Sequence, residues 1–324
     1  MTSDDQTTRT THATAGSATE AWGASRPATG DIIGQMAEQR RAASGSRIWR
    51  RLRSQPKAYV GLIFVLVLSL TAAFGPVLAP YDPDATDFPL FESPSLDHPM
   101  GTDSFGRDLF SRIIVGTRVS FTIGILAAVS SAIVGVFLGL VAGYRGGWVD
   151  SLIMRIVDLI WAFPVIILTV GMVAIFGAGA RNVVIAIAIA YIDDFARIVR
   201  GDVLRLREEE FTIAAKAIGL RDWRIMGRHI LPNLLAPVII LSTFAVGLGI
   251  LAESGLTFLG IGVDPSTPTW GLSLNEGRDF VRRAWWISVF PGVAIMFTVL
   301  ALNLLGDGLR DALDVKSVGE ETRT

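Results

Sequence analysis

Long stretches without a charged residue constrain this 324-residue chain more than any other feature. An uncharged apolar run of about 18 residues or more can cross the hydrocarbon core of a bilayer as one helix. Five such runs are present, at residues 58–81, 119–144, 159–180, 230–252 and 284–306. A sixth run, residues 182–192, is too short alone and needs the following DDFARIV segment to complete a span. The pattern predicts an all-α polytopic membrane protein with six transmembrane helices.

The composition supports this class and excludes others. Hydrophobic residues make up 51% of the chain and charged residues only 18%, against about 25% charged in average globular proteins. The net charge of −1 argues against bulk electrostatic binding to nucleic acid. The absence of cysteine excludes disulfides, thiolate metal sites and cysteine nucleophiles.

Enzymatic chemistry is not expected. None of the three lysines, Lys57, Lys216 and Lys316, follows a glycine as a phosphate-binding P-loop requires. The three histidines all lie outside the predicted spans, so no Ser/His dyad sits within the membrane. We therefore expect no catalytic residues, no cofactor and no bound metal in this chain.

Basic residues predict the orientation. A basic cluster at residues 47–57 precedes the first span directly, which favours a cytosolic amino terminus. Six crossings return the carboxyl terminus to the cytosol and place the arginine-rich segment 200–233 there as well. The loop before the second span has only Arg107 and Arg112 as positive charges and is expected outside.

The domain organisation follows from these features. Residues 1–46 are rich in Thr, Ala, Ser and Gly, which predicts a disordered cytosolic tail. The remaining parts are a basic flank with the first helix (47–80), an external loop (81–117), a transmembrane core (118–308) with a cytosolic loop at 205–232, and a cytosolic tail (309–324). The glycines Gly306 and Gly308 indicate the end of the sixth helix, and Gly135 and Gly139 indicate close helix packing in the second.

Four acids fall within or beside the spans, where a charge is costly and suggests a function. They are Asp158, Asp193, Asp194 and Glu253. Pairing of Asp158 with Arg155 and of Asp193 with Arg197, at helical spacing, predicts structural neutralisation near an interface. Glu253 has no such neighbour, and two hypotheses stay open: it lines a pathway, or it hydrogen-bonds to another helix near the external boundary.

The cytosolic segment around residues 208–233 has the most informative pattern. Phe211, Ala214, Ala215 and Ile218 recur at i, i+3, i+4 and i+7, which predicts an apolar stripe on one helical face. Gly219 suits a left-handed helix end, and Asp222 suits the N-cap of a second short helix that runs to Leu231 and Pro232. Two interpretations remain: helices lying on the lipid surface, or an apolar ridge that enters a groove of a soluble partner.

This segment resembles the signature of the inner-membrane permeases of binding-protein-dependent ABC importers, in particular the second permease of the dipeptide, oligopeptide and nickel type. That signature is E-A-A-x3-G-x9-I-x-L-P, and Ala214, Ala215, Gly219, Leu231 and Pro232 match it in register. Ile213 stands in place of the acid and His229 in place of the isoleucine. Further similar stretches are HPMGTDSFGRDLFSR (98–112), AGYRGGWVD (142–150), WAFP (161–164), LAESGLTFLGIG (251–262), STPTWG (266–271) and LNLLGDGLRDALD (302–314).

The resemblance implies a type I ABC importer permease in a bacterial inner membrane, with cytosolic coupling helices. It implies four partners: a second permease, two ATPase subunits that dock on residues 205–232, and an extracytoplasmic solute-binding protein facing the external loops. Peptides are the first expectation for the solute, with nickel chelates or another small solute as the alternative. A proton-coupled carrier using Asp158 and Glu253, or a scaffold that only recruits a partner, are the rival classes.

Overall fold

The computed structural model describes residues 55–313, and the regular elements in this range are helices. The predicted tail 1–46, most of the basic cluster and the last residues from 314 lie outside the described range. The helices are α2 (Pro56–Leu78), α3 (Leu109–Arg145), α4 (Gly147–Trp161), α5 (Val165–Phe176), α6 (Ala180–Ala190), α7 (Ile192–Leu206), α8 (Glu210–Ala217), α9 (Asp222–Ile225), a π turn (Met226–Ile230), α10 (Leu231–Phe258), α11 (Trp270–Gly277), a 3₁₀ turn (Arg278–Phe280) and α12 (Trp286–Leu313).

Four of the six predicted spans are confirmed as single helices. The residues described include four helices that are long and apolar enough to cross a membrane: α2, α3, α12 and the continuous segment Asp222–Phe258, which contains α10. Their core-facing residues alternate with broad apolar surfaces that remain exposed, such as Val60, Leu66 and Val67 on α2. Such surfaces are expected where lipid, rather than water, is the solvent.

The third and fourth predicted spans are divided. Helices α4 and α5 meet at an angle of 89° across Ala162–Pro164, so they form one broken span at most. The break lies where Pro164 lacks an amide hydrogen and disfavours helical geometry in the residue before it. The fourth is split at Tyr191 into α6 and α7, neither of which reaches 18 residues. The structure therefore gives four spans, or five with the bent pair, and the count of six stays a prediction.

Glycines on α3 let it pack directly on the backbone of α7. A Cβ added to Gly135 would lie 2.5 Å from Cβ of Phe195, and one added to Gly139 would lie 2.5 Å from the carbonyl oxygen of Ala196. Gly143 continues the series against Val203. The predicted small-residue packing is confirmed, and its partner is the α7 helix.

Helix α12 does not end at its glycines as predicted, because it continues to Leu313. Both glycines are contact points instead of a helix end. A Cβ on Gly306 would lie 2.6 Å from the hydroxyl of Thr243 on α10, and Gly308 faces Ala58 at the start of α2. A bulky side chain at either place would push two spans apart.

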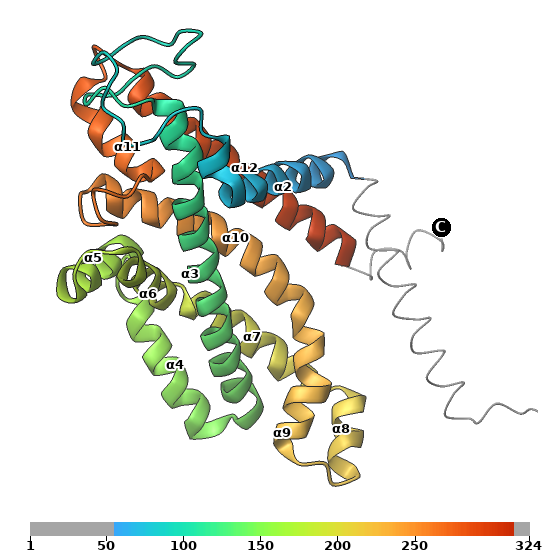
Figure 1. The fold of residues 1–324 in the computed structure, drawn as a ribbon. Helices are drawn as coiled ribbons and strands as arrows, with labels where there is room; N and C mark the ends of the chain where they lie inside the picture. Colours follow the sequence, from blue (N-terminus) through green and yellow to red (C-terminus); the bar gives the residue numbers. More distant parts are fainter. Residues whose placement is uncertain (1–54, 314–324) are drawn as a thin grey trace, which may run out of the picture. The chain divides into compact units, whose positions relative to one another are not determined.

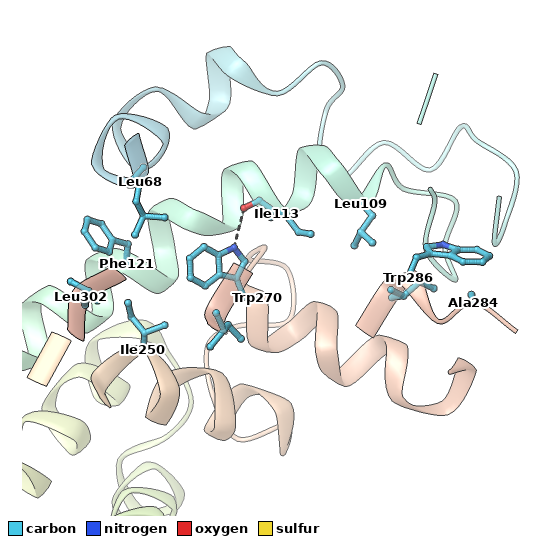
Figure 2. Close-up of a cluster of buried hydrophobic side chains, with 12 residues drawn as sticks. Leu68, Leu109, Ile113, Phe121, Ile250, Trp270, Ala284, Trp286 and Leu302 are labelled. Carbon is cyan, nitrogen blue, oxygen red and sulfur yellow. Dashed lines mark hydrogen bonds between the residues drawn. The ribbon is translucent and has the colours of Figure 1, made fainter. Parts of the chain in front are cut away.

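One cluster of buried apolar side chains joins α2, α3, α10, α11 and α12 (Figure 2). Two tryptophans of this cluster make hydrogen bonds near the start of α3. The indole of Trp270 is 1% exposed and donates a hydrogen bond to the carbonyl oxygen of Ile113 at 3.1 Å. The indole of Trp286 donates to the carbonyl oxygen of Thr102 at 3.1 Å. These two bonds tie α11 and α12 to the start of α3 and to the loop before it. Figure 1 shows α11 beside one end of α3, and α8 and α9 beyond the other.

Candidate functional site

The turn between α8 and α9 has the geometry predicted for Gly219. This glycine has φ of +78°, in the left-handed region. Its amide donates to the carbonyl oxygen of Lys216 at 2.9 Å, and the amide of Leu220 donates to that of Ala215 at 3.1 Å. These two bonds form a Schellman motif, which satisfies carbonyl groups left free at the helix end. The turn is therefore a defined structure, and glycine is the residue best suited to it.

The prediction for Asp222 is wrong in detail. Arg221 is the N-cap of α9, and Asp222 is its first helical residue. The Asp222 carboxylate accepts a hydrogen bond from the Tyr144 hydroxyl at 3.0 Å. Tyr144 lies in the last turn of α3 and is also covered by Lys216, whose ammonium is 5.3 Å from the ring centroid. An interaction 78 residues distant in sequence thus replaces the expected local cap.

The segment also makes apolar contacts with the ends of α3, α7 and α10. Ala215, Ile225 and Ile230 are buried in one cluster with Leu140 of α3 and Val203 of α7. Thr212 is fully buried, and its hydroxyl donates to the carbonyl oxygen of Leu206 at 2.8 Å. The second predicted helix is not separate, because α9 runs through the π turn into α10 without a break. Leu231 packs partly against the same cluster, and Pro232 lies exposed in the first turn of α10.

The predicted apolar stripe is divided between two faces. Ala215 points into the protein, whereas Phe211, Ala214 and Ile218 are exposed. The exposed fractions are 41% for Phe211, 76% for Ile218 and 64% for Trp223 on α9. Beside them lies a groove of about 510 Å³, lined by Leu220, Trp223, Arg224, Gly227, Arg228 and His229. The two departures from the family signature are accommodated here, because Ile213 is exposed and His229 lines the groove.

Two of the intramembrane acids lie differently from the predictions. Asp158 does not pair with Arg155; it pairs with Arg197 of α7 at 2.9 Å. The Arg197 guanidinium also lies 5.2 Å from the ring centroid of Trp161, at the end of α4. In the described residues Asp193 has no ion pair with Arg197 and is buried in α7, and Asp194 is half-buried next to it. The ion pair between Asp158 and Arg197 therefore connects α4 to α7.

Glu253 lies in a pocket of hydroxyl groups. Its side chain is fully buried and accepts hydrogen bonds from Thr257 at 3.0 Å and Ser254 at 3.2 Å. The hydroxyls of Ser120 on α3 and Thr269 before α11 lie near the same carboxylate. Of the two hypotheses left open by the sequence, full burial among hydroxyl groups favours a structural role over a place in a pathway, and the two hydrogen bonds given above come from its own helix, α10.

The loop before α3 is held by a buried ionic network. Arg107 binds Asp103 and, on α11, Glu276, each at 2.6 Å. Burial acts to lower the pKa of Arg107, but the two carboxylates outweigh it and raise that pKa. Arg112 is 1% exposed and donates to the carbonyl oxygen of Pro83 at 3.0 Å. Asp108 caps α3 by accepting from the Ser111 amide at 2.8 Å. The HPMGTDSFGRDLFSR stretch therefore builds a rigid cap on this end of the bundle.

Fold and site together define a polytopic membrane protein with a rigid polar cap at one end and an exposed apolar element at the other. The model of the family "Binding-protein-dependent transport system inner membrane component" matches residues 135–317, and that of the "N-terminal TM domain of oligopeptide transport permease C" matches residues 45–96. The chain belongs to this family of binding-protein-dependent inner-membrane permeases, and it is an ABC importer permease of the C type. The resemblance drawn from the motifs is confirmed.

Relatives and a solved structure agree with this assignment. The chain is 46% identical over 269 residues to the dipeptide transport system permease protein DppC of Alkalihalophilus pseudofirmus, covering 83% of this chain and 88% of the relative. It is 46% identical over 270 residues to the glutathione transport system permease protein GsiD of Pectobacterium atrosepticum, covering 83% and 90%. An inward-facing structure of the MetNI methionine ABC transporter matches the fold, with a TM-score of 0.52, 17% identity and coverage of 63% of this chain and 96% of that one.

Proposed function

We propose that this chain forms half of the transmembrane pathway of an ATP-driven importer of short peptides. A second permease completes the pathway, two ATPase subunits bind at residues 205–232, and an extracytoplasmic binding protein delivers the solute. The names of two relatives, which refer to dipeptide and to glutathione, support short peptides as the solute class. Nickel chelates or another small solute remain the alternative within the same importer type.

The observation that carries the proposal is the exposed apolar element on a rigid support. Phe211, Ile218 and Trp223 expose large apolar surfaces on α8, its C-cap and α9. The Schellman turn, the Tyr144 bond and the Thr212 bond hold these helices in place. A preformed apolar ridge with little conformational entropy to lose is suited to a groove in a protein partner. Docking of the ATPase is therefore favoured over simple adsorption to lipid.

The contacts of the segment also suggest how motion reaches the pathway. The segment is covalently continuous with α10 through the π turn, and it is bonded to the end of α3 through Tyr144. Displacement of α8 and α9 by ATPase closure would move both long helices together. Alternating access then requires no bond chemistry in this chain.

Orientation follows the same proposal. The cap built from residues 80–108 and α11 lies at the end where α3 begins, and α8 and α9 lie near the end where it finishes (Figure 1). Basic residues concentrate at the second end, which supports a cytosolic location for that end. The cap would then face the binding protein, and both termini would be cytosolic.

The test uses the complete complex in proteoliposomes that contain internal ATP. Uptake of a labelled dipeptide is compared with uptake of glutathione and of a nickel chelate, each with its binding protein, and with a proton gradient in place of ATP. The proposal predicts ATP-dependent uptake of a peptide. Uptake driven by the proton gradient alone would refute an ATP-driven importer, and uptake of the nickel chelate alone would refute peptides as the solute.

Docking is tested at one position by two substitutions. Phe211→Asp places a charge on the ridge and is expected to reduce co-purified ATPase and uptake at least tenfold. The matched control Phe211→Leu keeps an apolar side chain and is expected to retain both. Wild-type amounts of ATPase with Phe211→Asp would show that the ridge rests on lipid.

A further inference from the structure

A groove of about 530 Å³ lies between α3 and α6, away from the segment proposed for ATPase docking. Its walls are mostly apolar and include Leu126, Val184 and Ile185. Leu126 is 49% exposed and Ile185 40% exposed, so both walls are open to the surroundings of the chain. Two arginines, Arg118 and Arg181, complete the lining.

The two arginines occupy equivalent positions, each at the start of the apolar part of its helix. Arg118 immediately precedes the uncharged run of α3, and Arg181 immediately precedes the short apolar run of α6. Apart from Ala180, the apolar lining residues on α3 and α6 follow these arginines along each helix. In a bilayer this pattern places the guanidinium groups at the headgroup region and the apolar walls within the hydrocarbon.

No acid of the described chain neutralises these arginines. Both side chains are exposed, no acidic residue lines the groove, and neither guanidinium has a carboxylate within 4.0 Å in the described range. The first turn of α6, which contains Arg181, has no acidic residue either. The free amides and the dipole at this helix start add to the positive potential.

We propose that this groove binds an anionic phospholipid, with its phosphate between Arg118 and Arg181 and one acyl chain along Leu126 and Ile185. The two guanidinium groups offer planar pairs of N–H donors that match phosphate oxygens. Below the phosphate, the acyl chain covers the apolar walls of the groove, where a charged group would not be stable. The proposed orientation enters only in the choice of leaflet, which would be the outer one.

The charges favour a lipid over the second permease as the occupant. A protein surface covering the groove would need its own carboxylates opposite two arginines, at a depth where burial of charge is costly. An anionic phospholipid has a phosphate at the headgroup level and a hydrocarbon chain below it. Its chemistry therefore matches the groove from the arginines to the apolar floor.

The test is native mass spectrometry of the purified complex, titrated with phosphatidylglycerol and with phosphatidylcholine of the same acyl composition. Arg118→Gln with Arg181→Gln is expected to raise the dissociation constant for phosphatidylglycerol about 30-fold, equivalent to about 1 kcal/mol for each arginine. Phosphatidylcholine binding should change less than threefold. Arg282→Gln removes an exposed arginine outside the groove and is the matched control.

A second variant distinguishes the effect of the groove's shape from the effect of its two charges. Thr122→Trp fills the groove from an exposed position while both arginines remain, and it is expected to weaken binding of both lipids. Unchanged phosphatidylglycerol affinity in the double arginine variant would overturn the proposal. Loss of the second permease from that variant on purification would also overturn it, because the groove would then be a contact between the two permeases. Failure of the importer assignment would appear instead as absent ATP-dependent uptake in every variant, with lipid affinity unaffected.

Discussion

The turn at Gly219 allows the docking proposal to be tested with a change that adds no steric clash. A Cβ built on this glycine meets no atom within 4 Å, so the expected effect of a substitution is on the backbone conformation. At φ of +78°, a β-branched side chain costs roughly 1–2 kcal/mol. Asparagine tolerates the same region far better. Gly219→Val and Gly219→Asn therefore differ mainly in strain and both add a side chain into open space.

The strain converts into a measurable affinity. If the Schellman turn must form for the ridge to dock, 1–2 kcal/mol corresponds to a loss of about 5- to 30-fold in ATPase affinity. We expect this loss for Gly219→Val and a change below about threefold for Gly219→Asn. Membrane insertion should be normal in both variants, because the turn lies outside the apolar spans.

The assay is titration of the permease pair in nanodiscs with purified ATPase subunits, followed by ATP-dependent uptake with the same variants. The wild-type affinity and the amount of inserted permease serve as references. Wild-type affinity for both Gly219→Val and Gly219→Asn would refute the reasoning that the turn geometry positions the ridge. Equal loss in both would show that any side chain at this place obstructs the partner.

Three further outcomes are expected. Gly139→Ala places a Cβ 2.5 Å from a backbone oxygen of α7 and should destabilise the protein by about 1–3 kcal/mol in detergent unfolding; Gly201→Ala meets no atom within 4 Å and should be neutral or stabilising. Arg112→Met leaves the Pro83 carbonyl oxygen without its donor and should cost about 1–3 kcal/mol; thermal midpoints equal to wild type would contradict a structural role. Single cysteines at Leu96 and Ile213, which are 100% and 56% exposed, should react with an impermeant thiol reagent from outside and only after permeabilisation, respectively; the reverse pattern would invert the topology.

Span positions were largely predictable because they depend on composition alone. Uncharged runs of sufficient length became α2, α3, α10 and α12, although α3 begins ten residues before its run and α10 and α12 end six and seven residues after theirs. Pro164 predicts a kink or a helix start, and the 89° bend between α4 and α5 lies at this proline; hydropathy alone does not predict the bend. Hydropathy averages over a window and is insensitive to one missing amide hydrogen. The end of α12 was misjudged for a related reason, since a glycine marks a helix end and a close contact equally well.

Local features of the candidate site could be predicted from the sequence, whereas contacts between distant segments could not. Gly219 was predictable because left-handed backbone at a helix end strongly selects glycine. The bond from Tyr144 to Asp222 was not predictable, because its partners are 78 residues apart and no local rule connects them. The same limit explains Asp158, for which a neighbour at helical spacing was chosen although Arg197 on another helix is the partner. The burial of Thr212 was not predicted, because it depends on the fold of the segment, in which the Thr212 hydroxyl reaches the carbonyl oxygen of Leu206 at the end of α7.

The length of α3 gives these contacts a common mechanical meaning. At 1.5 Å per residue its 37 residues span about 55 Å, well beyond a hydrocarbon core of about 30 Å. Asp108 caps one end within the ionic network of the loop, and Tyr144 is hydrogen-bonded to Asp222 of α9 at the other. Between these ends, α3 contacts α7 directly at Gly135 and Gly139, where no side chain of α3 separates the two helices. A helix fixed in this way transmits displacement better than it absorbs it, so movement of α8 and α9 should reach the opposite end of the bundle within a single rigid element.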